Sequence, residues 1–412
     1  MRRWTIFRAA LAGAALTLAT AGTAQSSADH LPAGLTIDRV VVLMRHGVRP
    51  PTKAPPMPAA VTPETWPAWP VRPGWLTPHG ATGIGRIAAW DGARFRAWGL
   101  LPRAGCPAAG TMRVVADSDQ RTIATADAWI AAVAPACGIA SAHKPQDESD
   151  PAFSAIGSGL ASYDPARADA AVAAAIGADG VAAVEASHRA LLTRLDAILC
   201  GAGKPSCGVG QEPSRLDAAS PGKRPGLTGA LDRASTASQI LLLEYAEGKP
   251  MGEVGWGRAT AADIAALSTF HALEFRLLAR PLYVASANLA AIAPLIRDGL
   301  TGPARIMMIS GHDTNVASLG GLLDLHWQVP GLAADDPSPG GAILLERLRD
   351  RNGALYVRAL FRSQTLEQIR TAGALSPNAP YSAILPIPGC TARGVTGLCT
   401  LAAFETKLGG PG

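Results

Sequence analysis

Two arginines and a histidine follow a short apolar run near the start of the chain. The run at 40–44 is apolar and rich in β-branched residues, which is typical of a buried strand, and Arg45, His46 and Arg49 come directly after it. A double proline then ends regular structure. Guanidinium groups bind phosphate in a bidentate manner, and a neutral imidazole can attack phosphorus to give a phosphohistidine. The pattern therefore predicts an anion site, and phosphate is the anion that fits it best.

Two later segments end in side chains of complementary type. Arg121 follows a strand-like run at 111–116 and begins a helical pattern, where helix-terminus amides would add to its charge. Taken alone, Arg121 would be interpreted as a surface arginine paired with Asp117 or Asp119. His312 and Asp313 follow a third apolar run at 305–309. If the three runs are neighbours in one sheet, their ends meet at the edge where open α/β sheets bind ligands.

A phosphate monoester needs chemistry that these side chains can supply. Fixed cations hold the phosphate, a nucleophile attacks phosphorus, and an acid protonates the departing alkoxide. His46 suits the nucleophile, and Asp313 suits the acid, which could then accept a proton from water. We expect the arginines to lower the pKa of His46 and keep it neutral in mild acid, while Asp313 can still be protonated. This combination predicts an acidic pH optimum.

The elements that must position these residues can be read from the surrounding pattern. A proline-rich segment at 50–78 should form a long loop beside the site, with its tryptophans as packing anchors. Thr77 and Pro78 predict the start of a helix that lies against the sheet. Further strands are expected at 341–347 and 355–361, followed by a loop-rich tail from Pro377.

The middle of the chain has a different composition. Residues 141–300 are alanine-rich, with helical patterns at 165–200 and 227–247 and an exposed connection at 201–226. We interpret this part as a mainly α-helical cap domain over the site, and residues 25–140 with 301–412 as the α/β catalytic domain. The histidines His143, His188 and His271 lack metal-ligand spacing and are interpreted as ordinary surface or core residues.

Length, charge and the first residues limit the possible functions. The 412 residues are 48% hydrophobic and 17% charged, as in globular proteins. Residues 1–24 have the basic, apolar and small-residue parts of a signal peptide, and their apolar stretch is too short to span a bilayer. Removing their three arginines from the net charge of +5 leaves +2, which is too small to indicate nucleic-acid binding. We expect a periplasmic or secreted protein that does not bind membranes after signal cleavage.

The six cysteines fit export to an oxidising compartment. They form three local pairs without CxxC spacing, and an even count favours disulfides over metal ligation. Although 15 connectivities are possible, we predict nearest-neighbour pairing, with buried free thiols as the alternative. The predicted pairs are Cys106 with Cys137, Cys200 with Cys207, and Cys390 with Cys399.

The two motifs around His46 and Asp313 resemble those of the histidine acid phosphatases. The run 45–53 together with 312–315 is most similar to the bacterial periplasmic phytase and acid phosphatase members. The wider phosphoglycerate-mutase-like superfamily shares only the Arg-His-Gly core. The resemblance extends over nearly the whole mature chain, and further motifs carry it: Trp69-Pro70-Val71, Gly74-Trp75-Leu76-Thr77-Pro78, Gln120-Arg121-Thr122, Gly255-Trp256-Gly257-Arg258 and Pro339-Gly340-Gly341.

The resemblance implies a fold and a set of roles. The fold would be a phosphoglycerate-mutase-like α/β sheet domain, with helices on both faces, plus an α-helical cap domain. His46 would be the phosphorylated nucleophile and Asp313 the proton donor. The phosphate pocket would consist of Arg45, Arg49, Arg121 and His312, with Thr52 and Lys53 reaching the substrate beyond the scissile phosphate. No metal or other cofactor is implied, and we expect a monomer that binds a phosphorylated small molecule.

Some features of the sequence leave the substrate open. Gln239 stands where phytase-like members carry a glutamate, and no cysteines remain for the fourth disulfide that many of them have. Thr52 and Lys53 favour the phytase side over glucose-1-phosphatase relatives, which differ there. The prediction is an exported acid phosphatase that hydrolyses phytate. The alternatives are a glucose-1-phosphatase-like or broad acid phosphatase, a non-catalytic phosphate- or polyanion-binding protein, and a mutase-type phosphotransferase.

Overall fold

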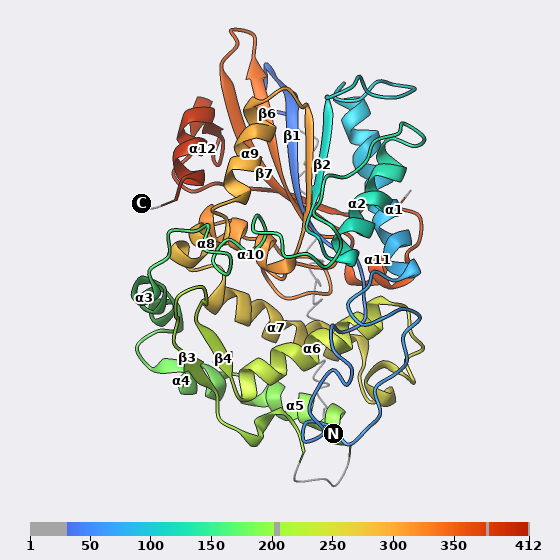
Figure 1. The fold of residues 1–412 in the computed structure, drawn as a ribbon, viewed down its shortest axis with the longest axis vertical. Helices are drawn as coiled ribbons and strands as arrows, with labels where there is room; N and C mark the ends of the chain where they lie inside the picture. The colour runs from blue at the N-terminus through green and yellow to red at the C-terminus, as the bar shows by residue number, and fades with distance from the viewer. Residues whose placement is uncertain (1–30, 202–206, 376–378, 411–412) are drawn as a thin grey trace, which may run out of the picture.

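The computed structural model describes residues 31–201, 207–375 and 379–410, and the predicted signal peptide at 1–24 lies outside these ranges. A central sheet with helices on both faces stands above a mainly helical part (Figure 1). The strands are β1 (Leu35–Arg45), β2 (Met112–Ala116), β3 (Arg215–Asp217), β4 (Gly226–Thr228), β5 (Ile306–Gly311), β6 (Ala342–Asp350), β7 (Leu355–Ser363), β8 (Tyr381–Leu385) and β9 (Cys399–Thr400). The helices are α1 (Pro78–Ala97), α2 (Gln120–Val133), α3 (Pro165–Ile176), α4 (Gly180–Ser187), α5 (Arg189–Cys200), α6 (Ala230–Ala246), α7 (Ala261–Leu278), α8 (Leu282–Asn288), α9 (Ile292–Thr301), α10 (Asp313–Leu322), α11 (Leu366–Thr371) and α12 (Leu401–Leu408).

The three strands predicted to carry the chemistry are neighbours in the sheet. The strand order is β2-β5-β1-β6-β7-β8, with β9 also paired to β7. The strands β2, β5 and β1 run parallel, and β6, β7 and β8 continue the sheet in antiparallel pairs. Arg45 is in register with Gly311, and Ala116 is in register with Ser310. The three strands therefore end at the same level, and the residues that follow them emerge side by side.

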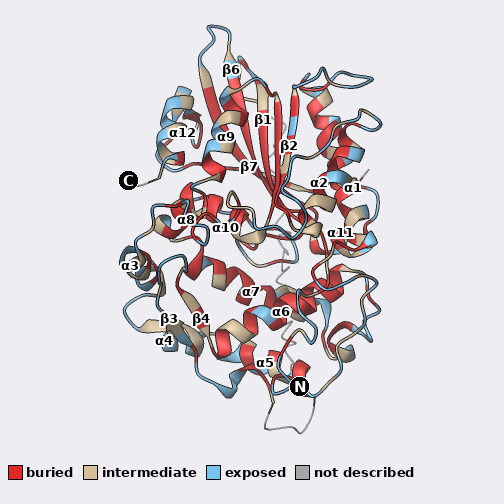
Figure 2. Ribbon diagram, in the orientation of Figure 1, coloured by how far each residue is buried: buried red, intermediate tan, exposed pale blue. Residues whose placement is uncertain are grey.

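Alternation along β1 assigns its side chains to two cores. Val40, Val42 and Met44 pack with residues of α1 and α2 on one face. Val41 and Leu43 pack on the other face with residues of α9, α10 and the cap helices. This alternation is what a strand buried on both sides requires. Figure 2 shows the result, with buried residues concentrated in the strands and in α6, α7 and α10.

The first helix begins where the sequence predicts. Thr77 is the N-cap of α1, and its Oγ1 accepts a hydrogen bond of 2.8 Å from the backbone N–H of Gly80. This start is packed tightly against the loop after β1, because a Cβ on Gly80 would lie 2.4 Å from the carbonyl oxygen of Val48. The start of α1 and the loop after β1 are thus held together by their backbones.

The lower part of the molecule is built mainly from α3 to α7 (Figure 1). A short antiparallel hairpin, β3–β4, begins within the segment 201–226 that the sequence predicted as an exposed connection, and β4 extends to Thr228, into the range predicted as helical. Its strands have three residues each, too few to show an alternating pattern. The tail after Pro377 also contains more structure than expected, since β8 and α12 lie within it.

One described stretch, 165–187, is long and apolar enough by composition to cross a membrane. In the structure Gly177 ends α3 and Asp179 precedes α4, so that the stretch forms two helices of 12 and 8 residues. Each is shorter than the roughly 20 residues that a bilayer requires.

The helix α9 lies on the sheet rather than in the helical part. A Cβ on Gly299 would meet the side chains of Val41 on β1 and Met307 on β5 at 2.6 and 2.8 Å. The predicted cap domain, residues 141–300, would include nearly all of α9. We propose that the cap ends before α9 and that the sheet domain resumes there.

The predicted cysteine pairing is present in the structure. Disulfides join Cys106 to Cys137, Cys200 to Cys207, and Cys390 to Cys399.

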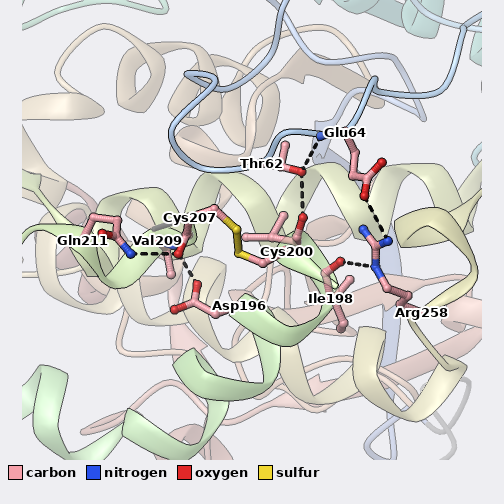
Figure 3. Close-up of a disulfide and its surroundings, with 10 residues drawn as sticks. Thr62, Glu64, Asp196, Ile198, Cys200, Cys207, Val209, Gln211 and Arg258 are labelled. Carbon is pink, nitrogen blue, oxygen red and sulfur yellow. Dashed lines mark hydrogen bonds and ion pairs between the residues drawn. A yellow bond between two sulfur atoms is a disulfide. The ribbon is translucent and has the colours of Figure 1, made fainter. Parts of the chain in front are cut away.

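The second disulfide lies where the proline-rich loop meets the cap (Figure 3). The hydroxyl of Thr62 in that loop donates a hydrogen bond of 2.7 Å to the carbonyl of Leu199, and the carboxylate of Glu64 lies 3.3 Å from the guanidinium of Arg258. Nε of Arg258 in turn donates a hydrogen bond of 2.7 Å to the carbonyl of Ile198. The loop beside the site is therefore attached to the end of α5.

Candidate active site

The backbone around His46 is held from two sides, by the end of β5 and by the loop before β6. Its N–H donates to the carbonyl of Gly311 at 3.0 Å, and its carbonyl accepts from Gly340 at 3.1 Å. Gly47 is required by close packing, because a Cβ there would lie 2.9 Å from the side chains of Ile84 and Leu76. The imidazole is thus fixed at the end of β1.

The hydrogen bonds of the imidazole define its tautomer. Nδ1 of His46 lies 2.8 Å from the carbonyl oxygen of Gly47. A carbonyl only accepts, so Nδ1 carries the hydrogen and Nε2 keeps its lone pair. Nε of Arg49 points at Nε2 from 3.4 Å. A neutral imidazole with Nε2 available is the form that can attack phosphorus.

The surroundings of His46 keep it neutral. Burial, together with Arg49, Arg121 and Arg45, lowers its pKa well below the usual value, as the sequence predicted from the arginines. The same cluster acts on its own members, since burial, Arg121 and Arg45 lower the pKa of Arg49 to about 9. The arginines therefore repel one another across the cavity, and a phosphate dianion bound between them would relieve this repulsion.

The remaining predicted phosphate ligands come from the ends of β2 and β5. Nη2 of Arg121 is 2.6 Å from Asp119, the ion pair that the local sequence predicted. Arg121 also lines the cavity in front of His46. Nε2 of His312 is 2.6 Å from Asp117 and 3.3 Å from Asp119. These two carboxylates orient both groups, and neither was assigned a role in the site from the sequence.

Asp313 lies between two cationic groups at the start of α10. Its Oδ2 is 3.0 Å from Nη2 of Arg45 and 3.7 Å from Nε2 of His271. Arg45 is fully buried and also donates to the carbonyl of Pro337 at 2.6 Å. Arg45 therefore stands behind Asp313 rather than in the open cavity.

One expectation from the sequence is wrong at this point, and one contact was not expected. Burial raises the pKa of Asp313, but Arg45, His271 and His46 outweigh it and hold that pKa well below the usual range. The carboxyl is therefore ionised in mild acid in this arrangement, not protonated. His271, interpreted as an ordinary histidine, is 5% exposed and faces Asp313 from α7.

Two adjoining cavities open in front of these residues. One, of about 520 Å³, is lined by His46, Arg49, Arg121, His312 and Asp313. The other, of about 400 Å³, is lined by Thr52, Lys53, Gln239, His271 and Asp313. The predicted site residues are thus brought together, with Thr52 and Lys53 in the second cavity, away from His46.

The two cavities share Arg224, which the sequence did not single out. Arg224 lies in the connection before α6 and lines both cavities, together with Arg49, Asp313 and Thr314. It adds a cation from the cap to those of the sheet. Only the pair of adjacent cations, Lys223 and Arg224, in an otherwise weakly patterned segment could have indicated it.

Comparison with known proteins identifies close relatives over most of the chain. Residues 36–170 and 284–362 match the histidine phosphatase superfamily (branch 2). The chain is 36% identical over 413 residues to the phytase AppA of Escherichia coli (strain K12), covering 93% of each protein. It is 29% identical over 428 residues to a glucose-1-phosphatase of Salmonella typhimurium, covering 98% of each. The structure of Hafnia alvei phytase in complex with myo-inositol hexakis sulphate is similar at a TM-score of 0.83 and 33% identity, covering 92% of this chain and 97% of that one.

Proposed function

The chain belongs to the histidine phosphatase superfamily (branch 2) and is a phosphomonoester hydrolase, and on that premise we propose that it hydrolyses phytate through a phosphohistidine on His46. The observation that carries this proposal is the state of His46. Its Nε2 is unprotonated, because Nδ1 donates to Gly47, and it lies in a cavity with Arg49, Arg121 and Asp313. A nucleophile, phosphate-binding cations and a proton-transfer group thus share one space.

The reaction has two steps. Nε2 of His46 attacks phosphorus as the bond to the leaving oxygen breaks, and Asp313 supplies the proton that this oxygen takes. Water then attacks the phosphohistidine and gives its proton to Asp313, which releases inorganic phosphate. Arg49 and Arg121 stabilise the equatorial oxygens throughout, and Arg45 positions Asp313.

The second cavity supports a substrate with several phosphates. Lys53 lines this cavity, which His46 does not line, and Arg224 lines both cavities, so that these two cations can bind phosphates other than the one transferred. A relative in this family is named phytase at 36% identity, above the 29% of the glucose-1-phosphatase. We infer that phytate, a ring with six phosphates, uses both cavities.

A direct test compares substrates by kcat/KM. Phosphate release would be measured at mildly acidic pH with phytate, glucose 1-phosphate and p-nitrophenyl phosphate. Preference for phytate and an acidic optimum are expected. Preference for glucose 1-phosphate, or a maximum well above neutrality, would contradict the proposal.

A specific observation favours the second candidate, a glucose-1-phosphatase-like or broad acid phosphatase. Gln239 of α6 is 9% exposed and lines the second cavity, and neither atom of its amide has a hydrogen-bond partner among the described residues. An unpartnered neutral amide can bind sugar hydroxyls as readily as phosphates. Because phytase-like members of the family carry a glutamate at this position, Gln239→Glu should raise the ratio of phytate to glucose 1-phosphate hydrolysis if this residue sets the preference.

We also propose that the enzyme is exported and acts as a monomer, without nucleic acid or membrane partners after processing. The three disulfides support an oxidising compartment. Fractionation of cells that express the full chain would test export, and recovery in the cytoplasm with reduced thiols would contradict it.

A further inference from the structure

We propose that His271 and Asp336 form a proton-delivery pair for Asp313, in which His271 supplies the proton for the leaving group and Asp336 positions His271. The proposal rests on the role of Asp313 given above, and it extends the reacting system to two residues outside the recognised motifs. His271 is a positioning and proton-relaying residue in this scheme, because it acts through Asp313.

The geometry places one imidazole between two carboxylates. Nδ1 of His271 is 2.9 Å from Oδ1 of Asp336, and Nε2, on the opposite edge, is 3.7 Å from Oδ2 of Asp313. Phe275 packs edge-on against the ring at 4.7 Å and an angle of 89°. The ring can therefore contact both carboxylates without turning over.

The contacts of Asp336 show that it is a fixed partner. It is 1% exposed, and its carbonyl accepts 2.9 Å hydrogen bonds from the indole of Trp327 and from the backbone of Ser338. The next residue, Pro337, holds Arg45 through its carbonyl. One short loop thus positions both groups that contact Asp313, namely Arg45 and, through Asp336, His271.

The electrostatics explain why such a pair is needed. Asp313 is ionised in this arrangement, and an ionised carboxylate cannot protonate a leaving group. Burial would lower the pKa of His271, but Asp336 and then Asp313 outweigh it and raise that pKa above its usual value. A proton is therefore stored on the imidazole beside the carboxylate that has to deliver it.

Among the residues that the structure describes, three charged groups act on His271. Asp336 faces it from the loop before β6, and Asp313 from α10. Arg45 on β1 opposes its protonation. Glu274, one turn further along α7, lines the same cavity but accepts a hydrogen bond from Ser235. Glu274 is therefore engaged by Ser235, and among the described residues the carboxylates that contact the ring are Asp313 at Nε2 and Asp336 at Nδ1.

The proton balance closes over the two steps. When a phosphate dianion enters, its charge raises the proton affinity of Asp313. The Nε2 proton moves from His271 to Oδ2 of Asp313 and then to the leaving oxygen as the bond between phosphorus and that oxygen breaks. In the second step water loses a proton to Asp313, which returns it to His271. One water is consumed, and one alcohol and one phosphate are formed. The 3.7 Å separation is slightly longer than a hydrogen bond, and catalytic contacts commonly tighten when substrate binds.

The test compares two leaving groups in matched variants. His271→Asn keeps an N–H near Asp336 but cannot release a proton to Asp313. The control is His79→Gln, because His79 lies at the start of α1 and its imidazole donates a hydrogen bond to the carbonyl of Ile369. Because kcat/KM reports the steps up to phosphohistidine formation, it is the quantity to compare. We expect His271→Asn to lower kcat/KM for an alkyl phosphate by about 30-fold and that for p-nitrophenyl phosphate by less than about threefold, since p-nitrophenolate needs little protonation. Equal losses on the two substrates would overturn the proposal.

A second variant separates relay from packing. Asp336→Asn keeps the shape but removes the charge that favours protonated His271, so the alkaline limb of the kcat/KM profile for the alkyl phosphate should move about one unit toward acid. An unmoved limb, with activity intact, would show that the pair only packs. The phosphohistidine intermediate is trapped in the same variants. If His46 is phosphorylated normally and the ratio of kcat/KM between the two substrates is unchanged in His271→Asn, the proton relay is refuted and the proposed function stands. If the wild-type enzyme turns over without phosphorylating His46, the proposed function fails and the relay with it.

Discussion

Replacing Asp313 by asparagine removes the proton-transfer group while it keeps the shape of the side chain. The carboxylate is 19% exposed and lies 3.0 Å from Arg45, whose other terminal nitrogen stays bound to the carbonyl of Pro337. The amide oxygen of asparagine can still face Arg45. We therefore expect Asp313→Asn to fold and to bind phosphate, and its loss of activity should report on proton transfer alone.

The size of the effect follows from the leaving group. Protonation by a positioned acid contributes about 10²–10⁴ in rate. For an alkyl phosphate we expect kcat/KM to fall by about 10³, which corresponds to about 4 kcal/mol at 1.36 kcal/mol per tenfold change. For p-nitrophenyl phosphate the loss should stay below about tenfold. The expected change in the ratio between the two substrates is therefore about 100-fold.

The assay is steady-state phosphate release at mildly acidic pH, with the release of p-nitrophenol followed in the first turnover. The matched control is Asp298→Asn, in an exposed aspartate paired with Arg113 at 2.7 Å, which should leave both substrates unchanged. Similar losses for the two substrates would refute the proton-transfer role of Asp313, since a general disturbance of the site affects both leaving groups alike.

Further predictions concern the cap, the metal requirement and pH. Lys53→Gln should lower kcat/KM for phytate by about tenfold and leave p-nitrophenyl phosphate within about twofold, because Lys53 lies in the second cavity; equal effects would contradict a polyanion role. Activity should persist in excess chelator, and its loss would indicate a metal requirement. Burial raises the pKa of Glu244 to about 7, so its protonated form stabilises the fold at acidic pH and this contribution is lost as pH rises from about 4.3 to 7. Urea unfolding of Glu244→Gln at pH 8 should therefore show a gain of up to about 3 kcal/mol over wild type, with no gain at pH 4.

Much of the sheet and the first contacts of the site could be predicted from the sequence. The runs before Arg45, Asp117 and His312 are short and apolar, and each ends in polar residues at a strand end. The carboxyl ends of parallel strands lie at one edge of the sheet, so that local patterns were sufficient to predict that the motifs meet there. The family resemblance added the roles, and the strand register now places these residues at the same level.

The parts that the sequence did not predict depend on long-range contacts. His271 is 65 residues from Asp336, and only the docking of α7 against the loop before β6 brings them together. Arg224 lies in a connection without periodicity, and the fold alone brings it to the site. The ionised state of Asp313 was not predicted for the same reason. The motif identifies Arg45 as a phosphate ligand, whereas in the structure Arg45 contacts the carboxylate of Asp313.

The central claim is that His46 carries the phosphoryl group during turnover. The most direct measurement is the intact mass and peptide map of the enzyme quenched in alkali while it hydrolyses p-nitrophenyl phosphate, for the wild type and for His46→Ala. We predict one phosphoryl group on the peptide that contains His46, none in the variant, and a loss of kcat of at least about 10³-fold in the variant. A phosphoryl group on another residue, or substantial turnover by His46→Ala, would contradict the account.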